Sequence, residues 1–253
     1  MKQGIFAVTD GLDGVGKGVV IDALVEYERE KGKRVFDLVP YWKKHRSHPD
    51  HKLLNEYDVI VSAEPTWGGI GADIREEFIA KGSTYSALAT AHTYSLDRLI
   101  LYKKLLIPAL EQGKIWLQSR AFSTSMIYQP VQAKMQGDEL SLREILALPG
   151  NVLAQQHAPD LFIITTIDHP EIALHRSSSR DKKDKCKFET LAYQLKFQPR
   201  FKSRWFRKRF EDLGTKVEYL DASISVEHTR AQAVGIWEEY LRNESRNISR
   251  TDE

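Results

Sequence analysis

The spacing of hydrophobic and polar positions divides the beginning of the chain into three elements. Residues 4–9 form a short apolar run, as in a buried β-strand, and they lead directly into a glycine-rich turn. Beyond the turn, Val20, Leu24 and Tyr27 recur at helical spacing until Gly32 ends the pattern. The pattern therefore predicts a strand, a tight turn and a helix in immediate succession.

The same two periods continue along the rest of the chain. Further apolar runs predict strands at residues 34–38, 58–63, 115–118, 161–167 and 216–220. Patterns with helical spacing predict helices at residues 72–80, 86–111, 123–135, 171–180, 190–213 and 226–242. Strands that alternate with helices are typical of a parallel sheet covered by helices, so we expect an α/β fold.

Two segments depart from this alternation. Residues 40–57 are polar and carry three histidines, beginning at His45, at intervals of three. That spacing permits a metal site, but no acidic or sulfur-containing partner completes a ligand set, so we interpret the segment as a surface insertion. Residues 243–253 have the composition of a polar tail. We therefore expect a single domain over residues 1–242.

The composition is that of a globular protein with a substantial core. Hydrophobic residues make up 42% of the chain and charged residues 28%, which is ordinary for this class. No apolar run approaches the ~20 residues that span a bilayer, and the first residues match a strand better than a signal peptide. Cys186 is the only cysteine, which excludes a disulfide framework and a cysteine metal cluster. These features predict a cytoplasmic protein that does not enter membranes.

Positive charge is concentrated in one part of the sequence. The formal net charge is only +2, but residues 176–209 contain thirteen Lys and Arg against Asp181, Asp184 and Glu189. Such a concentration suits a polyanionic ligand, either nucleotide phosphates or a nucleic acid. By composition alone, a solvated helix face is the simpler interpretation.

The glycine-rich turn has the spacing of a phosphate-binding loop. Gly11, Gly16 and Lys17 fit the Walker A pattern, and they stand between a strand and a helix, as such a loop requires. Glycines let backbone N–H groups turn towards phosphate oxygens, and the helix presents its positive end to the anion. Position 18 usually carries a Ser or Thr hydroxyl that ligates Mg²⁺, but here it is Gly18. We expect ATP to bind Gly11, Leu12, Asp13, Gly14, Val15, Gly16, Lys17 and Gly18.

Segments beyond the turn, taken together with it, resemble the thymidylate kinase family. Residues 63–75 resemble the family's Glu-Pro-Gly-Gly-Thr loop, followed by a helix with a late arginine. Residues 92–98 match its base-reading helix, and residues 118–122 stand where the family has an Asp-Arg-Tyr triplet. Residues 158–176 resemble the strand, turn and helix around its lid. The resemblance implies a single-domain P-loop kinase with a central five-stranded parallel sheet flanked by helices and a short lid at about 176–189.

Individual residues inherit roles from this resemblance. Tyr94 and Arg98 lie four positions apart and share one helical face. The resemblance assigns Tyr94 to stacking on the pyrimidine and Arg98 to a carbonyl oxygen of the base. It assigns Tyr128 to the deoxyribose, and Arg120 to the transferring and accepting phosphates. The family's triplet aspartate, which helps organise magnesium, is Ser119 here, so the metal ligand is left unassigned.

The implied site residues form two overlapping sets. The catalytic set is Asp13, Lys17, Arg120 and two lid arginines, Arg176 and Arg180. The substrate-binding set is Glu64, Tyr94, Arg98, Arg120, Tyr128 and Glu189. The lid arginines are expected over ATP because Gly14 stands where some family members carry an arginine in the phosphate loop.

These assignments predict phosphoryl transfer from ATP, with Mg²⁺, to a deoxynucleoside monophosphate, with dTMP favoured. A kinase for another or a modified pyrimidine deoxynucleotide remains open, because Tyr94 and Arg98 do not distinguish thymine from uracil or a modified ring. A second alternative is a nucleotide-binding protein without turnover that contacts nucleic acid through residues 176–209. Gly18 and Ser119 favour that alternative, and the acceptor-site matches oppose it. The resemblance also implies a homodimer formed through helices beside the sheet.

Overall fold

One parallel sheet organises the chain in the computed structural model, which describes residues 4–178 and 186–251. The sheet has six strands in the order β2-β3-β4-β1-β5-β6, and every neighbouring pair is parallel. The strands are β1 (Ile5–Gly11), β2 (Val35–Asp37), β3 (Val59–Ala63), β4 (Ile115–Ser119), β5 (Leu161–Thr166) and β6 (Lys216–Asp221). The expected α/β fold is confirmed. The resemblance implied five strands, one too few, whereas the six apolar runs each correspond to a strand, and the sixth, β6, pairs with β5 along its whole length.

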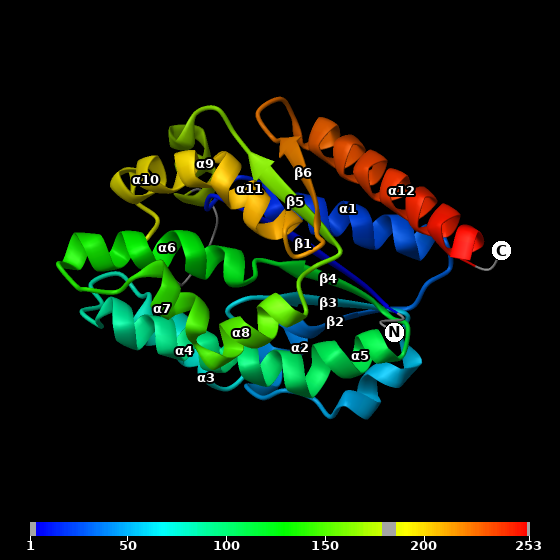
Figure 1. Ribbon diagram of the computed structural model, residues 1–253, viewed down its shortest axis with the longest axis horizontal. Helices are drawn as coiled ribbons and strands as arrows, with labels where there is room; N and C mark the ends of the chain where they lie inside the picture. Colours follow the sequence, from blue (N-terminus) through cyan, green and yellow to red (C-terminus); the bar gives the residue numbers. More distant parts are fainter. Residues whose placement is uncertain (1–3, 179–185, 252–253) are drawn as a thin grey trace.

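Helices cover both faces of this sheet (Figure 1). They are α1 (Lys17–Glu30), α2 (Leu38–His45), α3 (Ile70–Asp73), α4 (Ala87–Leu101), α5 (Ile107–Glu111), α6 (Phe122–Gln136), α7 (Leu142–Ala147), α8 (Pro149–Gln156), α9 (Pro170–Ser178), α10 (Leu191–Phe201), α11 (Arg204–Glu211) and α12 (Val226–Thr251). A 3₁₀ turn, η1 (His51–Glu56), and two π turns, η2 (Ile74–Phe78) and η3 (Tyr102–Leu106), complete the described elements. None of the described helices is both long enough and apolar enough to cross a membrane.

Most of the predicted helices are confirmed, with differences at their boundaries. The long helix expected at residues 86–111 runs through α4, η3 and α5. The helix expected at residues 190–213 is two, α10 and α11, because the hydroxyl of Ser203 accepts a hydrogen bond from the N–H of Phe206 at 3.2 Å and starts a new helix. Residues 243–251, expected to belong to a polar tail, instead continue helix α12, which ends at Thr251. Three helices, α2, α7 and α8, were not predicted, because they are too short for their periodicity to show.

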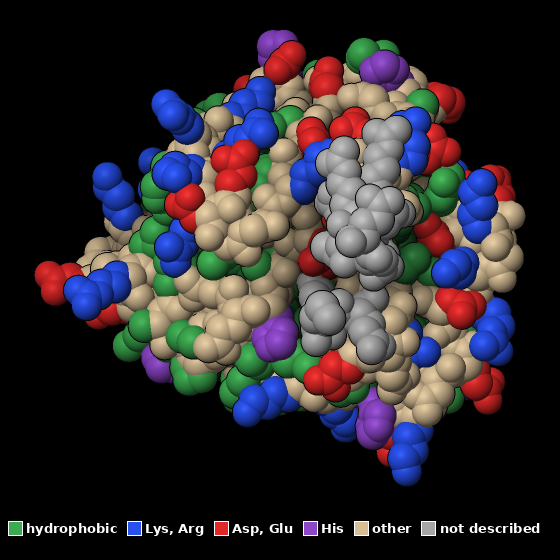
Figure 2. Space-filling view, turned by 45° about the vertical axis from the view of Figure 1, so that its right-hand side comes forward, with side chains coloured by type: hydrophobic (Ala, Val, Ile, Leu, Met, Phe, Trp, Pro, Cys, Tyr) green, Lys and Arg blue, Asp and Glu red, His purple; other side chains and the backbone are tan. Residues whose placement is uncertain are grey.

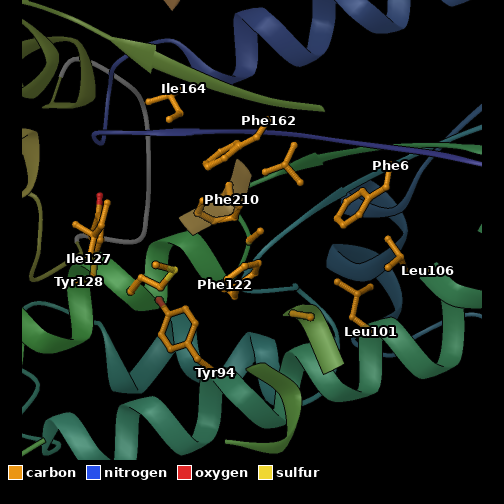
Figure 3. Close-up of a cluster of buried hydrophobic side chains, with 14 of the residues drawn as sticks. Phe6, Tyr94, Leu101, Leu106, Phe122, Ile127, Tyr128, Phe162, Ile164 and Phe210 are labelled. Atoms are coloured by element: carbon orange, nitrogen blue, oxygen red, sulfur yellow. The ribbon is translucent and has the colours of Figure 1, made fainter. Parts of the chain in front are cut away.

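Alternate residues of the central strands face two separate layers of the core. Phe6 and Val8 of β1 and Phe162 of β5 face the layer beside α4, α5 and α6, whereas Ala7 and Ile163 face α1 and α12. In Figure 3 the first layer fills the space between the strands and the helices below them. Burial on both faces fixes the strands, and with them the loops at their carboxyl ends.

Residues 40–57, expected to be a solvated surface insertion, contribute to this core. The segment includes most of α2 and all of η1, and the side chains of Trp42 and Leu54 are fully buried. The ring of His48 makes an edge contact with Trp42, with ring centroids 5.5 Å apart. In the ranges that the structure describes, no group of three or more His, Cys, Asp or Glu is placed to hold a metal ion. The ring of His48 therefore belongs to the packing of this segment.

His48 makes the fold sensitive to acid. Its two ring nitrogens are buried without a hydrogen-bond partner among the described residues. Burial, and secondarily the charge of Lys104, lowers the pKa of His48 from 6.5 to about 4. The unfolded chain therefore binds a proton at higher pH than the folded protein does. The contribution of His48 to stability is present above pH 6.5 and is lost as the pH falls through about 4.

We expect His48→Phe to flatten the decline in unfolding free energy over this pH window, because the ring contact with Trp42 is retained and the titrating group is removed. Urea denaturation at a series of pH values between 6.5 and 4 measures this decline. If wild type and variant lose stability equally over the window, the assignment to His48 is wrong.

Candidate active site

The carboxyl ends of three neighbouring strands meet at one edge of the sheet. β3, β4 and β1 lie side by side and parallel, so the loops that follow them open on the same side. The glycine-rich turn follows β1, Glu64 follows β3, and Arg120 follows β4. The fold therefore concentrates predicted site residues from distant parts of the sequence at this edge.

The glycine-rich turn has backbone geometry that favours glycine at several positions. Gly11, Gly14 and Gly16 have φ angles of 148°, 79° and 111°. A Cβ at Gly11 would lie 2.3 Å from the carbonyl oxygen of Thr165. α1 begins at Lys17, and the first N–H groups of a helix have no partner within it. The turn thus has the geometry of an anion-binding loop, as the Walker A spacing indicates.

The side chain of Lys17 folds back over this turn. It is 9% exposed, and its ammonium group donates hydrogen bonds to the carbonyl oxygens of Gly11 at 3.1 Å and Leu12 at 2.6 Å. These two bonds restrict the long side chain to the inside of the loop. A positive charge is therefore placed where phosphate oxygens bind in loops of this kind.

A cavity of about 270 Å³ opens beside the turn. The predicted residues that line it are Asp13, Gly14, Gly16, Lys17, Gly18, Glu64, Tyr94, Arg120, Tyr128 and Glu189. The cavity brings together predicted donor-site and acceptor-site residues. The predicted residues outside its lining are Gly11, Leu12, Val15, Arg98 and Arg176.

Three of the lining residues form one hydrogen-bonded cluster. The guanidinium of Arg120 pairs with one carboxylate oxygen of Asp13, and the other oxygen accepts a hydrogen bond from the hydroxyl of Tyr128 at 3.1 Å. The guanidinium also lies over the ring of Tyr128, 5.4 Å from its centroid. Although burial opposes the charge, Asp13 raises the pKa of Arg120 well above its usual value. The cluster therefore holds a permanent cation in the cavity wall.

The backbone at Arg120 is held in a left-handed conformation, with a φ angle of 67°. Its N–H donates to the carbonyl oxygen of Thr9 at 2.8 Å, and the side chain of Gln118 donates to its carbonyl oxygen at 2.9 Å. Asp10, which is fully buried, lies 3.6 Å from its guanidinium and accepts a hydrogen bond from Ser123 at 2.6 Å. Such a conformation costs about 1–3 kcal/mol and persists where the surroundings fix it, often at functional sites. Asp10 was not predicted, although it stands directly before the turn.

Two predicted tyrosines give the cavity aromatic walls. Tyr94 comes from α4 and Tyr128 from α6, and both are buried. Figure 3 shows Tyr94 pointing from α4 towards the core layer below the strands. Tyr128 stacks on Phe197 of α10, with ring centroids 3.9 Å apart. Burial raises the pKa of both hydroxyls, so both rings stay neutral at physiological pH.

Arg98, predicted to contact the base, lies in the interior next to the cavity residue Glu64. It is 1% exposed, and it donates to one oxygen of Glu64 from Nε at 2.8 Å and from Nη2 at 2.5 Å. A further N–H donates to Asn151 of α8, a partner that the sequence did not indicate. Burial raises the pKa of Glu64 to about 7, against the opposing effect of Arg98. The contact of Arg98 with a base stays a prediction.

Arg75 lines the cavity but was not among the predicted site residues. Its Nε donates to the carbonyl oxygens of Pro65 and Thr66, each at 3.1 Å, and its guanidinium lies 4.2 Å from the ring centroid of Trp67. The signal was present in the sequence, since Arg75 is the late arginine of the segment at residues 63–75. Three positively charged side chains at this edge, Lys17, Arg75 and Arg120, suit phosphate oxygens, as do the N–H groups of the loop.

A second cavity of about 390 Å³ adjoins the same turn. Arg176 lines it and donates a hydrogen bond to the carbonyl oxygen of Ala222 at 2.9 Å. Gly14 and Gly16 line both cavities, so the turn forms a wall shared between them. Arg180, the other predicted lid arginine, lies outside the described residues.

Residues 186–189, at the end of the expected lid, lie beside the first cavity. Cys186 forms a bridge with Ala80, and Cys186, Phe188 and Glu189 line the cavity. Burial raises the pKa of the Cys186 thiol to about 12, so the thiol stays protonated. The ring of Phe188 makes an edge contact with the ring of Tyr128, with centroids 5.4 Å apart.

Comparisons with known proteins identify the family of the chain. The family model described as thymidylate kinase matches residues 51–232, well over half of the chain. The chain is 29% identical to the thymidylate kinase of Caldicellulosiruptor saccharolyticus over 81% of this chain and 86% of that protein. It is 27% identical to the thymidylate kinase of Mycoplasmoides gallisepticum over 98% and 100%, and 26% identical to a probable thymidylate kinase of Thermococcus gammatolerans over 94% and 98%. The chain belongs to the thymidylate kinase family.

Proposed function

We propose that this protein transfers the terminal phosphoryl group of ATP to dTMP, with ADP and dTDP as products. The observation that carries the proposal is the wall of Gly14 and Gly16 that the two cavities share. A triphosphate wrapped by this turn extends from the cavity at Arg176 to the cavity at Arg120. The nucleoside of ATP then lies on the Arg176 side, and its last phosphate meets an acceptor on the other side. The names of the related proteins support dTMP as that acceptor.

Phosphoryl transfer asks the protein mainly for position and positive charge, because little covalent chemistry falls to its side chains. Lys17 neutralises charge on the outer phosphates of ATP. Arg120 lines the first cavity beside the turn, and it stabilises the charge that spreads over the transferring group. Asp13 pairs with Arg120 and so holds the guanidinium in place before substrate arrives.

The acceptor occupies the part of the cavity between α4 and α6. Tyr94 offers a face on which a pyrimidine stacks, and Tyr128 packs against the deoxyribose. Arg75 and Arg120 pair with the monophosphate. Glu64 lines this cavity and accepts two hydrogen bonds from Arg98. These bonds hold the carboxylate of Glu64 in place beside the acceptor.

Membership in the family implies Mg²⁺, but the residues around the turn do not offer the usual ligands. Gly18 has no hydroxyl, and the carboxylate of Asp10 accepts hydrogen bonds from the hydroxyls of Ser123 and Thr124 at 2.6 and 2.8 Å. Ser119 lines the cavity where the family has a carboxylate. Where Mg²⁺ accompanies ATP, it would be held by the phosphates and by water, since this ion keeps several waters readily, and it would supply neutralisation of phosphate charge. No step of the mechanism requires a protein ligand to the ion.

Gly18→Ser restores the missing hydroxyl without steric conflict, because a Cβ at Gly18 meets no atom within 4 Å. We expect Mg²⁺ to strengthen ADP binding to the variant by about tenfold more than it strengthens binding to wild type. Isothermal titration of ADP with and without Mg²⁺ measures both ratios. Gly18→Ala is the matched control, since it changes the backbone freedom equally. Equal ratios in the Ser and Ala variants would show that the hydroxyl does not reach the ion.

Turnover on a panel of acceptors tests the proposed function. Release of ADP is measured from ATP and Mg²⁺ with dTMP, dUMP, dCMP, dGMP or AMP. We expect the highest kcat/KM for dTMP. Preference for a different or modified pyrimidine would select the alternative kinase, and no ADP above background with any acceptor would overturn the proposal.

The nucleic-acid alternative receives no support from the described part of the basic segment. Lys202, Arg207 and Lys208 pair with acidic partners at 3.2, 2.6 and 2.7 Å. Figure 2 shows Lys and Arg interspersed with Asp and Glu over the face it draws. Paired charges of this kind are those of a solvated helix face rather than of a polyanion-binding patch.

A homodimer is proposed on the strength of the family resemblance and one exposed helix face. Leu88 and Leu96 of α4 are 52% and 44% exposed, and they lie on the same face because they are eight positions apart. A second copy of this chain covers such a face well. Sedimentation equilibrium measures the mass in solution, and a monomer at micromolar concentration would rule this arrangement out.

A further inference from the structure

The unpredicted helix α2 belongs to a segment, residues 38–57, that is attached to the loop between β3 and α3. This loop, residues 64–69, is called the acceptor loop below. The carbonyl oxygen of Arg46 accepts a hydrogen bond from the N–H of Gly69 at 2.9 Å. The guanidinium of Arg46 forms a two-pronged ion pair with Glu76 of η2, at 2.6 and 2.7 Å. The contact is close at Gly68 as well, where a Cβ would lie 2.9 Å from the ring of Trp42. The 38–57 segment therefore holds the acceptor loop and η2 together.

A third residue of this loop, Trp67, connects the segment to the cavity. The ammonium of Lys43 on α2 lies 4.7 Å from the centroid of the Trp67 ring, and the guanidinium of Arg75 lies 4.2 Å from the same centroid. Arg75 in turn lines the cavity, whereas Trp67 and Lys43 do not. The indole ring is thus in contact with one cation from the 38–57 segment and one cation of the acceptor site.

The contacts of Arg75 explain how the ring of Trp67 affects the orientation of the guanidinium. Its Nε donates to the carbonyl oxygens of Pro65 and Thr66, and its Nη2 donates to that of Pro65, so they fix the Nε–Nη2 edge of the guanidinium. The ring of Trp67 restricts the plane of the guanidinium, because a cation over an aromatic ring is attracted to its face. An arginine recognises phosphate by a planar fork, so the orientation of that plane decides how well it binds. The ring and the two carbonyl oxygens together therefore preorganise the fork.

We propose that Trp67 is a positioning residue for the acceptor phosphate and that the 38–57 segment acts as its support. Trp67 acts through Arg75, which orients the monophosphate of the acceptor. The inference rests on the proposed function, since it takes the anion in this cavity to be the phosphate of dTMP. It gives the segment a role in acceptor binding rather than in ATP binding, because its contacts are with the loop after β3 and with η2.

The experiment compares dTMP with thymidine, which lacks the phosphate. Binding of each to the full-length protein is measured by isothermal titration without ATP. We expect Trp67→Leu to weaken dTMP binding by about 5- to 20-fold and to leave thymidine binding unchanged. Trp67→Phe should restore most of the affinity, because it keeps an aromatic face beside Arg75. Steady-state assays should show a higher KM for dTMP and an unchanged KM for ATP.

Two controls separate positioning from a general loss of structure. Trp205→Leu removes a tryptophan that is 46% exposed on α11, away from the cavity, and should change none of these values. The acceptor loop also has an independent attachment, since Asp97 accepts hydrogen bonds from the N–H and the hydroxyl of Thr66, both at 2.7 Å. We therefore expect Trp67→Leu to keep the thermal midpoint near that of wild type.

A double-variant cycle identifies the residue through which Trp67 acts. In an Arg75→Met background, Trp67→Leu should produce no further loss of dTMP affinity. Arg46→Ala should weaken dTMP binding less than Trp67→Leu does, and without an effect on thymidine, if the 38–57 segment supports the ring. Independent losses from Trp67→Leu and Arg75→Met, or equal losses for dTMP and thymidine, would overturn the inference.

The outcomes also distinguish this inference from the proposed function. If Arg75→Met leaves dTMP binding unchanged, the placement of the acceptor phosphate at Arg75 is wrong and the proposed function loses that contact. If Arg75→Met weakens dTMP binding and Trp67→Leu does not, the acceptor site stands and only the role of Trp67 fails.

Discussion

Replacing Lys17 with methionine should lower kcat by about 10²- to 10³-fold, the range seen when a charged or hydrogen-bonding group is removed from a developing transition-state charge. The ammonium group lies inside the glycine-rich turn and is fixed there by the carbonyl oxygens of Gly11 and Leu12. Methionine has a similar length and no charge, so the change removes the cation with little change in volume. Steady-state kinetics with ATP and dTMP measures the loss.

The same variant offers an internal control, because the contacts proposed for the acceptor nucleoside come from other residues. Tyr94 and Tyr128 come from α4 and α6, and the dTMP affinity of Lys17→Met should stay within a few-fold of wild type. A thermal midpoint close to wild type would show that the turn still folds. A kcat within tenfold of wild type, with both controls satisfied, would refute the role given to this lysine.

Local chemistry explains what the sequence could predict. The glycine-rich turn is specified by residues next to one another, since Gly11 and Gly16 need positive φ angles and Lys17 begins a helix. Its geometry therefore follows from spacing alone. The central strands were predictable for a related reason, since burial on both faces requires continuous apolar runs. The confirmed family membership rests on the order of several such local patterns.

Contacts between distant residues explain what the sequence could not predict. Arg98 looks like a base-reading arginine in its own helix, but its partners Glu64 and Asn151 come from 34 and 53 positions away. Trp67 and Lys43 likewise meet only after α2 packs beside the acceptor loop. Periodicity reports which face of an element is buried, and it does not report what that face meets. Pairings of this kind require the folded structure.

The site joins its two halves through one carboxylate. Asp13 belongs to the phosphate turn, yet it accepts hydrogen bonds from Tyr128 of α6 and, at 3.4 Å, from Gln194 of α10, and it pairs with Arg120 after β4. A shift of any one of these elements would move the guanidinium of Arg120 in the wall of the first cavity. Asp13 therefore brings residues of the turn, α6, α10 and the segment after β4 into direct contact.

Arg120→Lys should lower kcat by about 10³-fold or more, with a smaller effect on either KM. The magnitude follows from arginines that contact a transferring phosphoryl group, whose planar fork spans two oxygens at once. Lysine keeps the positive charge beside Asp13 and Asp10, and so it avoids leaving two carboxylates without a cation. It cannot reproduce the fork, and its single ammonium group cannot bridge donor and acceptor phosphates.

Arg120→Met is the comparison that separates charge from geometry. Removing a buried cation from paired carboxylates typically costs about 3–5 kcal/mol, so this variant should unfold at a clearly lower temperature than Arg120→Lys. We therefore expect the lysine variant to be stable but nearly inactive, and the methionine variant to lose both properties. Kinetics and thermal unfolding of the two proteins, measured side by side, test this. A lysine variant with kcat within tenfold of wild type would mean that Arg120 supplies charge alone, and the bridging role would have to be abandoned.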